Sequence, residues 1–320
     1  MSNLLVSVIV PNYNHARFLK QRIDSILNQT FTDYELIILD DCSADNSKEI
    51  IDLYADNEKV SHIVYNDTNS GSLFSQWQKG LALAQGEWIW IAESDDYSAP
   101  NFLETLMSKT SDGVSLVFCK SNIVDEDGAY VSDSSVWLSD IAGQMLGKDF
   151  VIEGKTLFYD VHAYKNIVSN TSSAVFRKDV VDNVQFSYGY KICGDWLFFA
   201  QMTLTGNVVY VAEPLNYWRQ HSKTTRNIGP LETERMRLQE NMDIVRHFSS
   251  MAKKAGHQLD YSKYNWLIDG WLRQFTYKNL LKWKYVNPPM PYKLKFRFHC
   301  RLIQRFFVEL CKSFKKRLFK

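Results

Sequence analysis

The feature that most constrains the fold is a regular alternation of short apolar runs with stretches of helical periodicity. The apolar runs are rich in β-branched residues and end in polar ones, as buried parallel strands do. They occupy residues 4–10, 34–40, 61–66 and 87–92, and the helical stretches between them occupy residues 15–29, 43–55 and 72–85. This alternation predicts an α/β fold built on a mostly parallel, doubly wound sheet.

The rest of the chain changes character twice. Residues 114–131 contain two extended runs joined by an Asp-Gly pair, which is a hairpin signal, and two later segments offer further strands. Strand signals stop near residue 230, and three helical segments follow, the last one after a run of prolines. Because 320 residues is long for a single domain, we predict a sheet domain at residues 1–229 and a helical region at residues 230–320.

The strand ends are where a ligand site is expected, because open parallel sheets bind ligands beyond the carboxyl ends of their strands. The four predicted strands are followed by Pro11-Asn12-Tyr13-Asn14, Asp40-Asp41-Cys42-Ser43, Asn66-Asp67 and Glu93-Ser94-Asp95-Asp96. Neither of the glycine-rich phosphate loops of nucleotide-binding folds is present. Carboxylates without such a loop need a divalent cation to hold a diphosphate, and hard oxygen ligands suit Mg²⁺ or Mn²⁺.

The last of these segments lies in the stretch GEWIWIAESDDYSAP and raises a question of charge. Glu93, Asp95 and Asp96 place three carboxylates within four residues at the end of an apolar run. Like charges this close raise one another's pKa unless a cation or hydrogen-bond donors offset them. The alternative is a solvated turn at the strand end, with Pro100 opening the next helix.

Four ordered motifs resemble the family 2 glycosyltransferases, which are inverting enzymes of the GT-A fold. They are the segment from VSVIVPNYN to LDDCSADNS, the stretch GEWIWIAESDD, the sequence CGDWLFF and the sequence YWRQHS. The similarity covers roughly residues 5 to 225, and the remaining 95 or so residues lie outside it. The resemblance implies that residues 1–229 form a GT-A catalytic domain.

The resemblance also implies roles for individual residues in the donor site. Pro11 and Tyr13 match the loop that packs on the nucleotide base, and Asp41 matches the carboxylate that accepts a hydrogen bond from uracil. Asp95 matches a residue at the ribose and diphosphate, and Asp96 matches the metal ligand of the D-x-D motif. Two alternatives stay open: Tyr13 as a residue that only covers the sheet end, and Asp41 as a cap of the following helix.

Other positions carry the implied chemistry. Asp195 matches the catalytic base, with a helix N-cap as the alternative, and His221 matches a histidine that reaches the metal or diphosphate in some members, with a structural histidine as the alternative. Glu93 occupies a variable position of the motif. Many members carry an arginine after the third strand, where this chain has QWQKG, so Lys79 is the candidate substitute.

The implied activity is transfer of a sugar from a nucleoside-diphosphate sugar, with UDP expected, to a hydroxyl group. The family setting is bacterial surface polysaccharide biosynthesis, with a glycan or a lipid-linked molecule as acceptor. Two other classes stay open. A non-catalytic sugar-nucleotide binding protein would not need Asp195, and a nucleotidyltransferase would need a glycine-rich, basic N-terminal loop that is missing here.

Charge and cysteine usage bear on partners and location. The 37 basic and 36 acidic residues nearly cancel, which argues against a nucleic-acid partner. The five cysteines are scattered without metal-ligand spacing, as reduced thiols of a cytoplasmic protein would be. The N-terminus has no basic region before its apolar run, so we expect no signal peptide.

The C-terminal tail is strongly basic. Residues 293–320 contain ten basic residues and one acid, a net charge of +9. At helical spacing, the tail predicts an apolar side of Ile303, Phe306, Leu310 and Phe314 and a basic side of Arg301, Arg305, Lys312 and Lys316. Such a helix either lies on an anionic membrane surface, here the inner face of the plasma membrane, or packs its apolar side on the catalytic domain.

Overall fold

The computed structural model describes residues 5–184, 189–222, 231–275 and 290–318. Its internal contacts divide the chain into two units, Met1–His221 (unit 1) and Ser222–Lys320 (unit 2). The predicted boundary between residues 229 and 230 falls at the end of the segment 223–230, which lies outside the described residues. The two units are described separately below.

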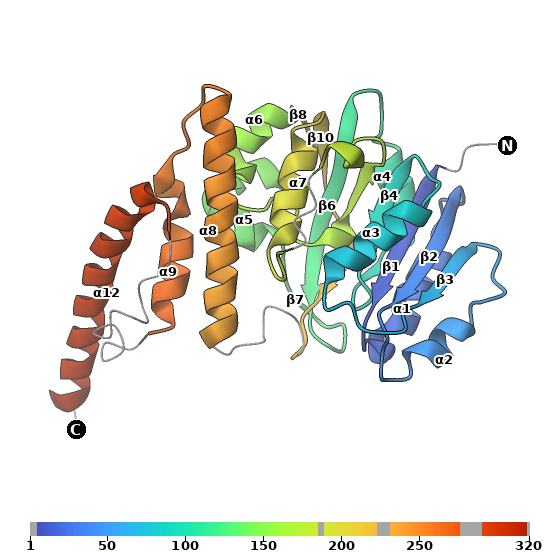
Figure 1. The fold of residues 1–320 in the computed structure, drawn as a ribbon, viewed down its shortest axis with the longest axis horizontal. Coiled ribbons are helices and arrows are strands. Elements are labelled where there is room, and N and C mark those ends of the chain that lie inside the picture. The colour runs from blue at the N-terminus through green and yellow to red at the C-terminus, as the bar shows by residue number, and fades with distance from the viewer. Residues whose placement is uncertain (1–4, 185–188, 223–230, 276–289, 319–320) are drawn as a thin grey trace. The chain divides into compact units, whose positions relative to one another are not determined.

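The first half of unit 1 has the predicted alternation of strands and helices (Figure 1). The strands β1 (Val6–Asn12), β2 (Tyr34–Asp40), β3 (Val60–Tyr65) and β4 (Trp88–Ile91) alternate with the helices α1 (Ala16–Leu27), α2 (Ser47–Asp52) and α3 (Leu73–Leu83). β1 pairs in parallel with both β2 and β4, and β2 pairs in parallel with β3. The carboxyl ends of these strands therefore meet at one edge of the sheet.

The second half of unit 1 turns this into a mixed sheet. The strand order is β3-β2-β1-β4-β9-β6-β10-β5. β9 (Ala174–Arg177) lies antiparallel between β4 and β6 (Val114–Val124), and β10 (Asn207–Arg219) runs parallel to β6. β5 (Tyr97–Ser98) and β8 (Phe150–Glu153) pair with β10, and β7 (Tyr130–Asp133) pairs with β6 in the predicted hairpin. The predicted α/β class is confirmed.

Short helices complete unit 1. They are α4 (Phe102–Met107), α5 (Ser135–Ala142), α6 (Gly154–Leu157) and α7 (Gly194–Thr203), with 3₁₀ turns at Met145–Gly147, Thr171–Ser173 and Val181–Asn183 and a π-helical turn at Phe158–His162. α7 begins at Gly194, with Cys193 at the N-cap, so Asp195 is the second residue of its first turn. Helix α7 thus supplies the residue that the sequence pattern marks as the base.

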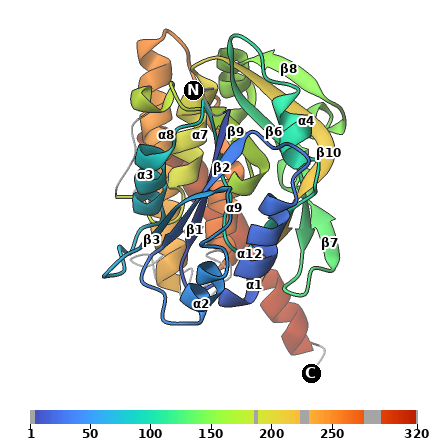
Figure 2. The ribbon, with the colours of Figure 1, turned by 90° about the vertical axis from the view of Figure 1, so that its right-hand side faces the viewer.

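Two apolar cores lie on the two faces of this sheet because successive side chains of a strand point to opposite faces. Ile9 belongs to the core that also contains Trp77 of α3. Its neighbours in β1, Val8 and Val10, belong to the other core, together with Leu19 of α1. α1 and α3 accordingly cover opposite faces, as Figure 2 shows. The sheet is buried on both sides, which leaves its carboxyl edge as the place for polar groups.

A buried histidine makes the stability of unit 1 depend on pH. His162 is fully buried, and its Nδ1 lies 2.9 Å from Thr203 Oγ1. Burial lowers the pKa of His162 from 6.5 to about 3, although Asn166 opposes the shift. The unfolded chain therefore takes up a proton below pH 6.5 that the folded chain refuses until about pH 3.

We therefore expect acid to destabilise the protein through this residue. At about 1.4 kcal/mol per pH unit, the contribution of His162 falls by about 2 kcal/mol between pH 7 and pH 5. His162→Asn can keep a hydrogen bond to Thr203 and should remove this part of the loss. Urea denaturation of both proteins at the two pH values measures it, and equal losses in both would contradict the prediction.

Unit 2 consists of helices, as predicted, with no strand among its described residues. They are α8 (Leu231–Lys254), a 3₁₀ turn at Tyr261–Tyr264, α9 (Asn265–Arg273) and α12 (Tyr292–Leu318). α9 contacts both other helices, and Arg301 of α12 forms an ion pair with Asp269 of α9 at 3.0 Å. None of the helices in the described part of the chain is long and apolar enough to cross a membrane.

The tail helix α12 buries a different stripe from the predicted one. Leu294, Phe298 and Leu302 are buried, at a spacing of four residues. Ile303, which we placed on the apolar side, is 58% exposed, and Phe306 and Leu310 are half-buried. The side chain of Phe314 lies outside the described residues. The apolar positions of α12 therefore form two stripes, one buried and one exposed.

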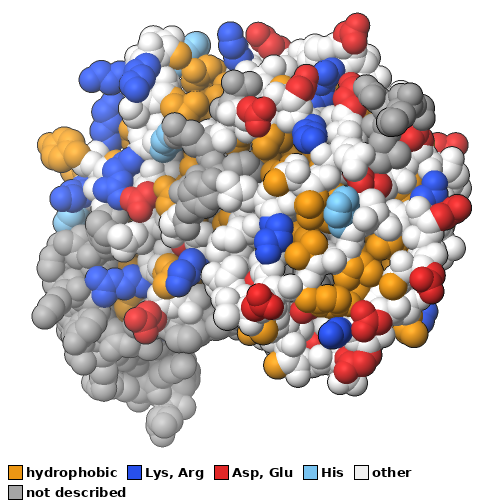
Figure 3. Space-filling view, turned by 45° about the vertical axis from the view of Figure 1, so that its right-hand side comes forward, with side chains coloured by type: hydrophobic (Ala, Val, Ile, Leu, Met, Phe, Trp, Pro, Cys, Tyr) orange, Lys and Arg blue, Asp and Glu red, His pale blue; other side chains and the backbone are white. Residues whose placement is uncertain are grey.

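The exposed stripe of α12 contains large side chains. Tyr292, Phe296, Ile303 and Phe307 are all more than half exposed. They recur at intervals of four or seven residues and thus share one side of the helix. Elsewhere, basic and acidic side chains are interspersed over the face seen in Figure 3, in keeping with the nearly balanced composition. The tail is thus set apart by its basic charge together with this apolar stripe.

Candidate active site

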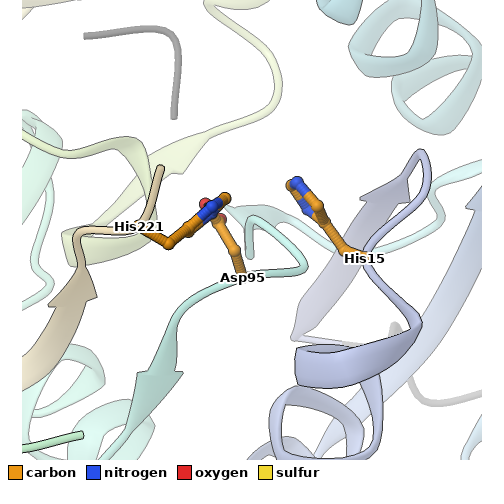
Figure 4. Close-up of side chains that lie close together, drawn as sticks. All are labelled: His15, Asp95 and His221. Atoms are coloured by element: carbon orange, nitrogen blue, oxygen red, sulfur yellow. The ribbon is translucent and has the colours of Figure 1, made fainter. Parts of the chain in front are cut away.

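Three side chains gather at the carboxyl edge of the sheet of unit 1. Asp95 follows β4, His221 follows β10, and His15 opens α1 directly after β1. His221 Nε2 lies 3.1 Å from Asp95 Oδ2, and ligand atoms of all three residues lie within 4.8 Å of one another. In Figure 4, His221 and Asp95 lie against each other and His15 faces them from the other side. This arrangement can hold a metal ion.

Arg22 places a buried positive charge near the three carboxylates of the acidic segment. It is a fully buried residue of α1, and its Nε donates a hydrogen bond to the backbone oxygen of Glu93 at 2.8 Å. Burial lowers the pKa of Arg22 to about 10, while the charges of Asp96 and Asp95 favour its protonated form. The guanidinium therefore stays positive at neutral pH and offsets the carboxylates next to it. Arg22 was not among the site residues predicted from the sequence.

Arg219 provides a second buried cation. It is the last residue of β10 and is 2% exposed. Its Nε donates to the backbone oxygen of Asp95 at 2.9 Å, and its backbone N–H donates to Asp96 Oδ1 at 2.9 Å. The end of β10 thus fixes both the path and the side chains of the acidic turn.

Asp96, the predicted metal ligand, is enclosed by protein groups. It is 1% exposed, and it accepts further hydrogen bonds from Asn170 Nδ2 at 2.9 Å and Ser172 Oγ at 2.7 Å. Burial and then the charge of Asp95 raise the pKa of Asp96 to about 6. Protein donors thus surround the carboxylate of Asp96, whereas the carboxylate of the neighbouring Asp95 lies beside His221 and His15.

The other two acids of the turn have opposite protonation tendencies. Burial favours the neutral form of Asp95, but the hydrogen bond from His221 and the charges of His15 and His221 outweigh it and hold the pKa of Asp95 below its usual value. Burial and the charges of Asp95 and Asp96 raise the pKa of Glu93 well above its usual value. Trp77 Nε1 also donates to Glu93 Oε1 at 3.1 Å. Of these two acids, Asp95 is thus the one that is ionised at neutral pH.

Asp41, the predicted partner of the base, is buried beneath the loop that leads to α3. Its carboxylate accepts hydrogen bonds from Asn66 Nδ2, Asn69 Nδ2, Gln76 Nε2 and both the backbone N–H and the hydroxyl of Ser70, at 2.6 to 3.2 Å. A carboxylate has about four lone-pair sites. These donors satisfy the Asp41 carboxylate, which thereby shapes the loop. A nucleotide base that donates a hydrogen bond to Asp41 must replace one of them.

The remaining donor-site candidates lie around the same edge. Pro11 is buried within β1, whereas Tyr13 is 48% exposed just beyond the strand. Asn14 and Cys42 have positive φ angles of 55° and 61°, in the loops after β1 and β2. Lys79 donates a hydrogen bond to Asn66 Oδ1, beside the Asp41 network. Tyr13 therefore presents an aromatic surface next to the polar groups of this edge.

Asp195 lies in the first turn of α7. The N-cap of that helix is Cys193, so Asp195 does not occupy the capping position that we considered as its alternative role. Asn166 Nδ2 donates to Asp195 Oδ2 at 3.1 Å. The ring of Phe198, one turn further along α7, lies 5.6 Å from that of Trp77, which itself bonds to Glu93. α7 and the acidic turn thus both contact the side chain of Trp77.

His15 was not among the predicted site residues. Its signal was its place in PNYNHARF, directly after the first strand end and before the helix. That position could have been included because it lies at the same sheet edge as the acidic segment.

A separate hollow of about 700 Å³ lies at the other end of β4, lined by Gly86, Glu87 and Arg177 among others. Glu87 directly precedes β4, whereas the acidic turn follows it. The hollow is therefore remote from the candidate site.

Comparison with known proteins agrees with this architecture. The sequence is 26% identical over 253 residues to the glycosyltransferase GlyG of Streptococcus pneumoniae, a match that covers 77% of this chain and 78% of that protein. It is 29% identical over 183 residues to the GalNAc(5)-diNAcBac-PP-undecaprenol beta-1,3-glucosyltransferase of Campylobacter jejuni, covering 57% of this chain and 54% of that one.

Solved structures share the fold. TarS 1-349 of S. aureus superimposes with a TM-score of 0.57 at 18% sequence identity, over 98% of this chain and 91% of that chain. This likeness confirms the predicted GT-A fold with C-terminal helices. The sequence profile of the family described as Glycosyl transferase family 2 matches residues 7–182, more than half of the chain. The chain therefore belongs to glycosyl transferase family 2.

Proposed function

We propose that the protein is an inverting glycosyltransferase that transfers a sugar from a UDP-linked donor to a hydroxyl group. The observation that carries the proposal is the pair of Asp95 and His221, 3.1 Å apart at the carboxyl edge of the sheet. Tyr13 lies exposed beyond the neighbouring strand of that edge. A nucleoside diphosphate would fit such a site, with its diphosphate near Asp95 and His221 and its base on the ring of Tyr13.

The proposal includes a divalent cation, Mn²⁺ or Mg²⁺, held by Asp95 and His221. An ionised carboxylate and an imidazole are both ordinary ligands of divalent metals. Asp96, which the resemblance assigned as the ligand, has three donors of its own, so we propose that it positions the turn. When bound, a divalent cation stabilises the negative charge of a departing diphosphate as a Lewis acid.

Side chains of the protein bind the donor and move the proton. Pro11 and Tyr13 bind the nucleotide base, and Asp41 accepts a hydrogen bond from that base after one of the loop donors to Asp41 has moved away. Asp195 takes the proton of the acceptor hydroxyl as the new bond forms, because a hydroxyl is a poor nucleophile near neutral pH. Attack on the face opposite the diphosphate inverts the anomeric configuration.

The similar proteins favour the details of this proposal. TarS 1-349 has structures in complex with UDP and with UDP-GlcNAc. A mannosyltransferase of Pyrobaculum calidifontis, with a TM-score of 0.52, has one with GDP-Man and Mn²⁺. The name of the Campylobacter relative specifies a lipid-linked acceptor. These findings support a nucleotide-sugar donor, a divalent metal and a bacterial glycan or lipid-linked acceptor.

Release of nucleoside diphosphate tests the proposal. The full chain is incubated with UDP-sugars and GDP-mannose, with and without glycan acceptors, in Mn²⁺, Mg²⁺ or chelator. We expect metal-dependent release that an acceptor accelerates, and a product whose anomeric configuration, read by NMR, is inverted. Binding without release would favour the non-catalytic binding protein, and formation of a nucleotide sugar from a nucleoside triphosphate and a sugar phosphate would favour the nucleotidyltransferase.

We also propose that α12 rests on an anionic membrane, with the exposed stripe of Tyr292, Phe296, Ile303 and Phe307 among the acyl chains. Lys293 and Lys295 are exposed beside this stripe. Each basic residue near such a surface contributes roughly 1 kcal/mol and is screened by salt. The proposal would place a lipid-linked acceptor within reach of the enzyme.

Vesicle co-sedimentation checks this prediction. The full chain should bind vesicles that contain phosphatidylserine, bind less in high salt, and ignore vesicles of phosphatidylcholine alone. The double substitution Phe296→Glu and Ile303→Glu should abolish binding, because it puts acids in the apolar stripe. Val131→Glu is the matched control, since Val131 is 60% exposed in β7 of unit 1. Equal binding by all three proteins would refute the membrane role.

A further inference from the structure

His15 is oriented as histidine ligands of metals are. Its Nδ1 lies 2.8 Å from Ser94 Oγ, and Ser94 is a buried residue of the acidic turn itself. Metal-binding histidines usually engage a second polar group through the nitrogen that does not touch the metal, which fixes the ring. Ser94 provides that second contact for His15. It also directly precedes Asp95 in the chain, so the same turn holds the carboxylate and orients the ring.

The two imidazole rings are also held against each other. The ring centroids of His15 and His221 lie 5.5 Å apart, with their planes almost perpendicular. Phe18, one turn into α1, packs on both, at 4.9 Å from His221 and 6.2 Å from His15. Residues from β1–α1 and from the end of β10 are thereby brought to the same carboxylate.

From this geometry we infer that His15 is a third protein ligand of the cation site, and that the site selects a first-row transition metal such as Mn²⁺ over Mg²⁺. The inference rests on the proposed function and assigns a residue and a metal preference to its cation. Two ligands about 2.1 Å from one ion lie at most about 4.2 Å apart. The three side chains, within 4.8 Å of one another, need only a small rotation to reach this.

The preference follows from the ligand types. Mg²⁺ favours oxygen ligands in strict octahedral geometry and keeps much of its water, whereas imidazole suits the first-row transition metals. A site with one carboxylate and two imidazoles therefore binds Mn²⁺ better than Mg²⁺. Without His15 it would be a carboxylate with a single imidazole, and the difference between the two metals should shrink.

Mn²⁺ binding to the full chain tests the inference without any transfer reaction. Free Mn²⁺ is measured by electron paramagnetic resonance, and spin-echo modulation of bound Mn²⁺ reports coordinated imidazole nitrogens. We expect two imidazoles in the wild type and one in His15→Gln, with Mn²⁺ affinity lowered at least about 10-fold, because loss of a group that only positions a metal ligand already costs about 10- to 100-fold. The excess of Mn²⁺ affinity over Mg²⁺ affinity should fall in the same variant.

His62→Gln is the matched control, because His62 Nδ1 also lies near a serine hydroxyl, Ser61 Oγ at 3.1 Å, but on β3. His15→Asn places a residue that is favoured at helix N-caps at this N-cap position. It replaces the glutamine variant if that variant is unstable. Two imidazole signals and unchanged affinity in both His15 variants would overturn the inference and leave the proposed function standing. A wild type that binds no Mn²⁺, alone or with UDP, would overturn the inference and the metal-dependent function together.

Discussion

Asp195→Asn is expected to lower the rate of sugar transfer by about 10²- to 10⁴-fold, the range typical for loss of a general base. The amide has nearly the same volume and can still bond to Asn166, which donates to Asp195 Oδ2 at 3.1 Å. It cannot accept the proton of the acceptor hydroxyl. Binding of UDP-sugar, measured by calorimetry, should therefore stay near the wild-type value while transfer is lost.

Glu104→Gln provides the control for this experiment. Glu104 is another acid in the first turn of a helix, α4, so its removal has a similar effect on the helix dipole. We expect transfer by this variant at the wild-type rate. Transfer by Asp195→Asn at a rate close to wild type would remove Asp195 from the role of base.

Arg22→Met is expected to lower the free energy of unfolding by about 3 to 5 kcal/mol, the size of effect seen when a buried charge loses the opposite charge that compensates it. The side chain is fully buried, and its Nε bonds to the backbone oxygen of Glu93 at 2.8 Å. Methionine is similar in length and apolar, so the change mainly removes charge. The carboxylates of Asp95 and Asp96 would then lose the charge of a buried guanidinium that interacts with both. Urea denaturation at pH 7 measures the effect.

Two further variants separate charge from packing in this test. Arg17→Met changes an exposed arginine of the same helix, paired with Glu126 and Asp127, and should cost less than about 1 kcal/mol. Asp96→Asn in the Arg22→Met background should restore part of the lost stability, because it removes one uncompensated charge. No recovery in the double variant would mean that Arg22 acts through packing alone.

The parallel half of the sheet could be predicted because its signals are local. β1, β2 and β4 are continuous apolar runs, and the polar residues after them mark the carboxyl edge. The place of β9 could not be predicted in the same way. Its four residues read as a strand, but their position between β4 and β6, antiparallel to both, depends on long-range contacts.

The candidate site shows the same division. Asp95 and His221 could be selected from motifs in the sequence, and the structure brings them together. Arg22 could not, because an arginine among the apolar residues of a helix gives no sign that its charge is directed at a turn 71 residues away. His15 was missed for a related reason: its partners, Ser94 and His221, are distant in the chain.

The pairing of the acidic turn with the end of β10 has a consequence for the order in which the protein matures during synthesis. Residues 93–96 leave the ribosome more than a hundred residues before Arg219, whose backbone N–H and guanidinium bond to Asp96 and Asp95. Until β10 is in place, the turn lacks these donors, and His221 has not been made. A chain released before β10 therefore carries the strands β1 to β4 without the groups that complete the acidic turn. If the proposed function holds, we expect such truncated products not to consume a nucleotide sugar, so donor use begins only once the sheet domain is complete.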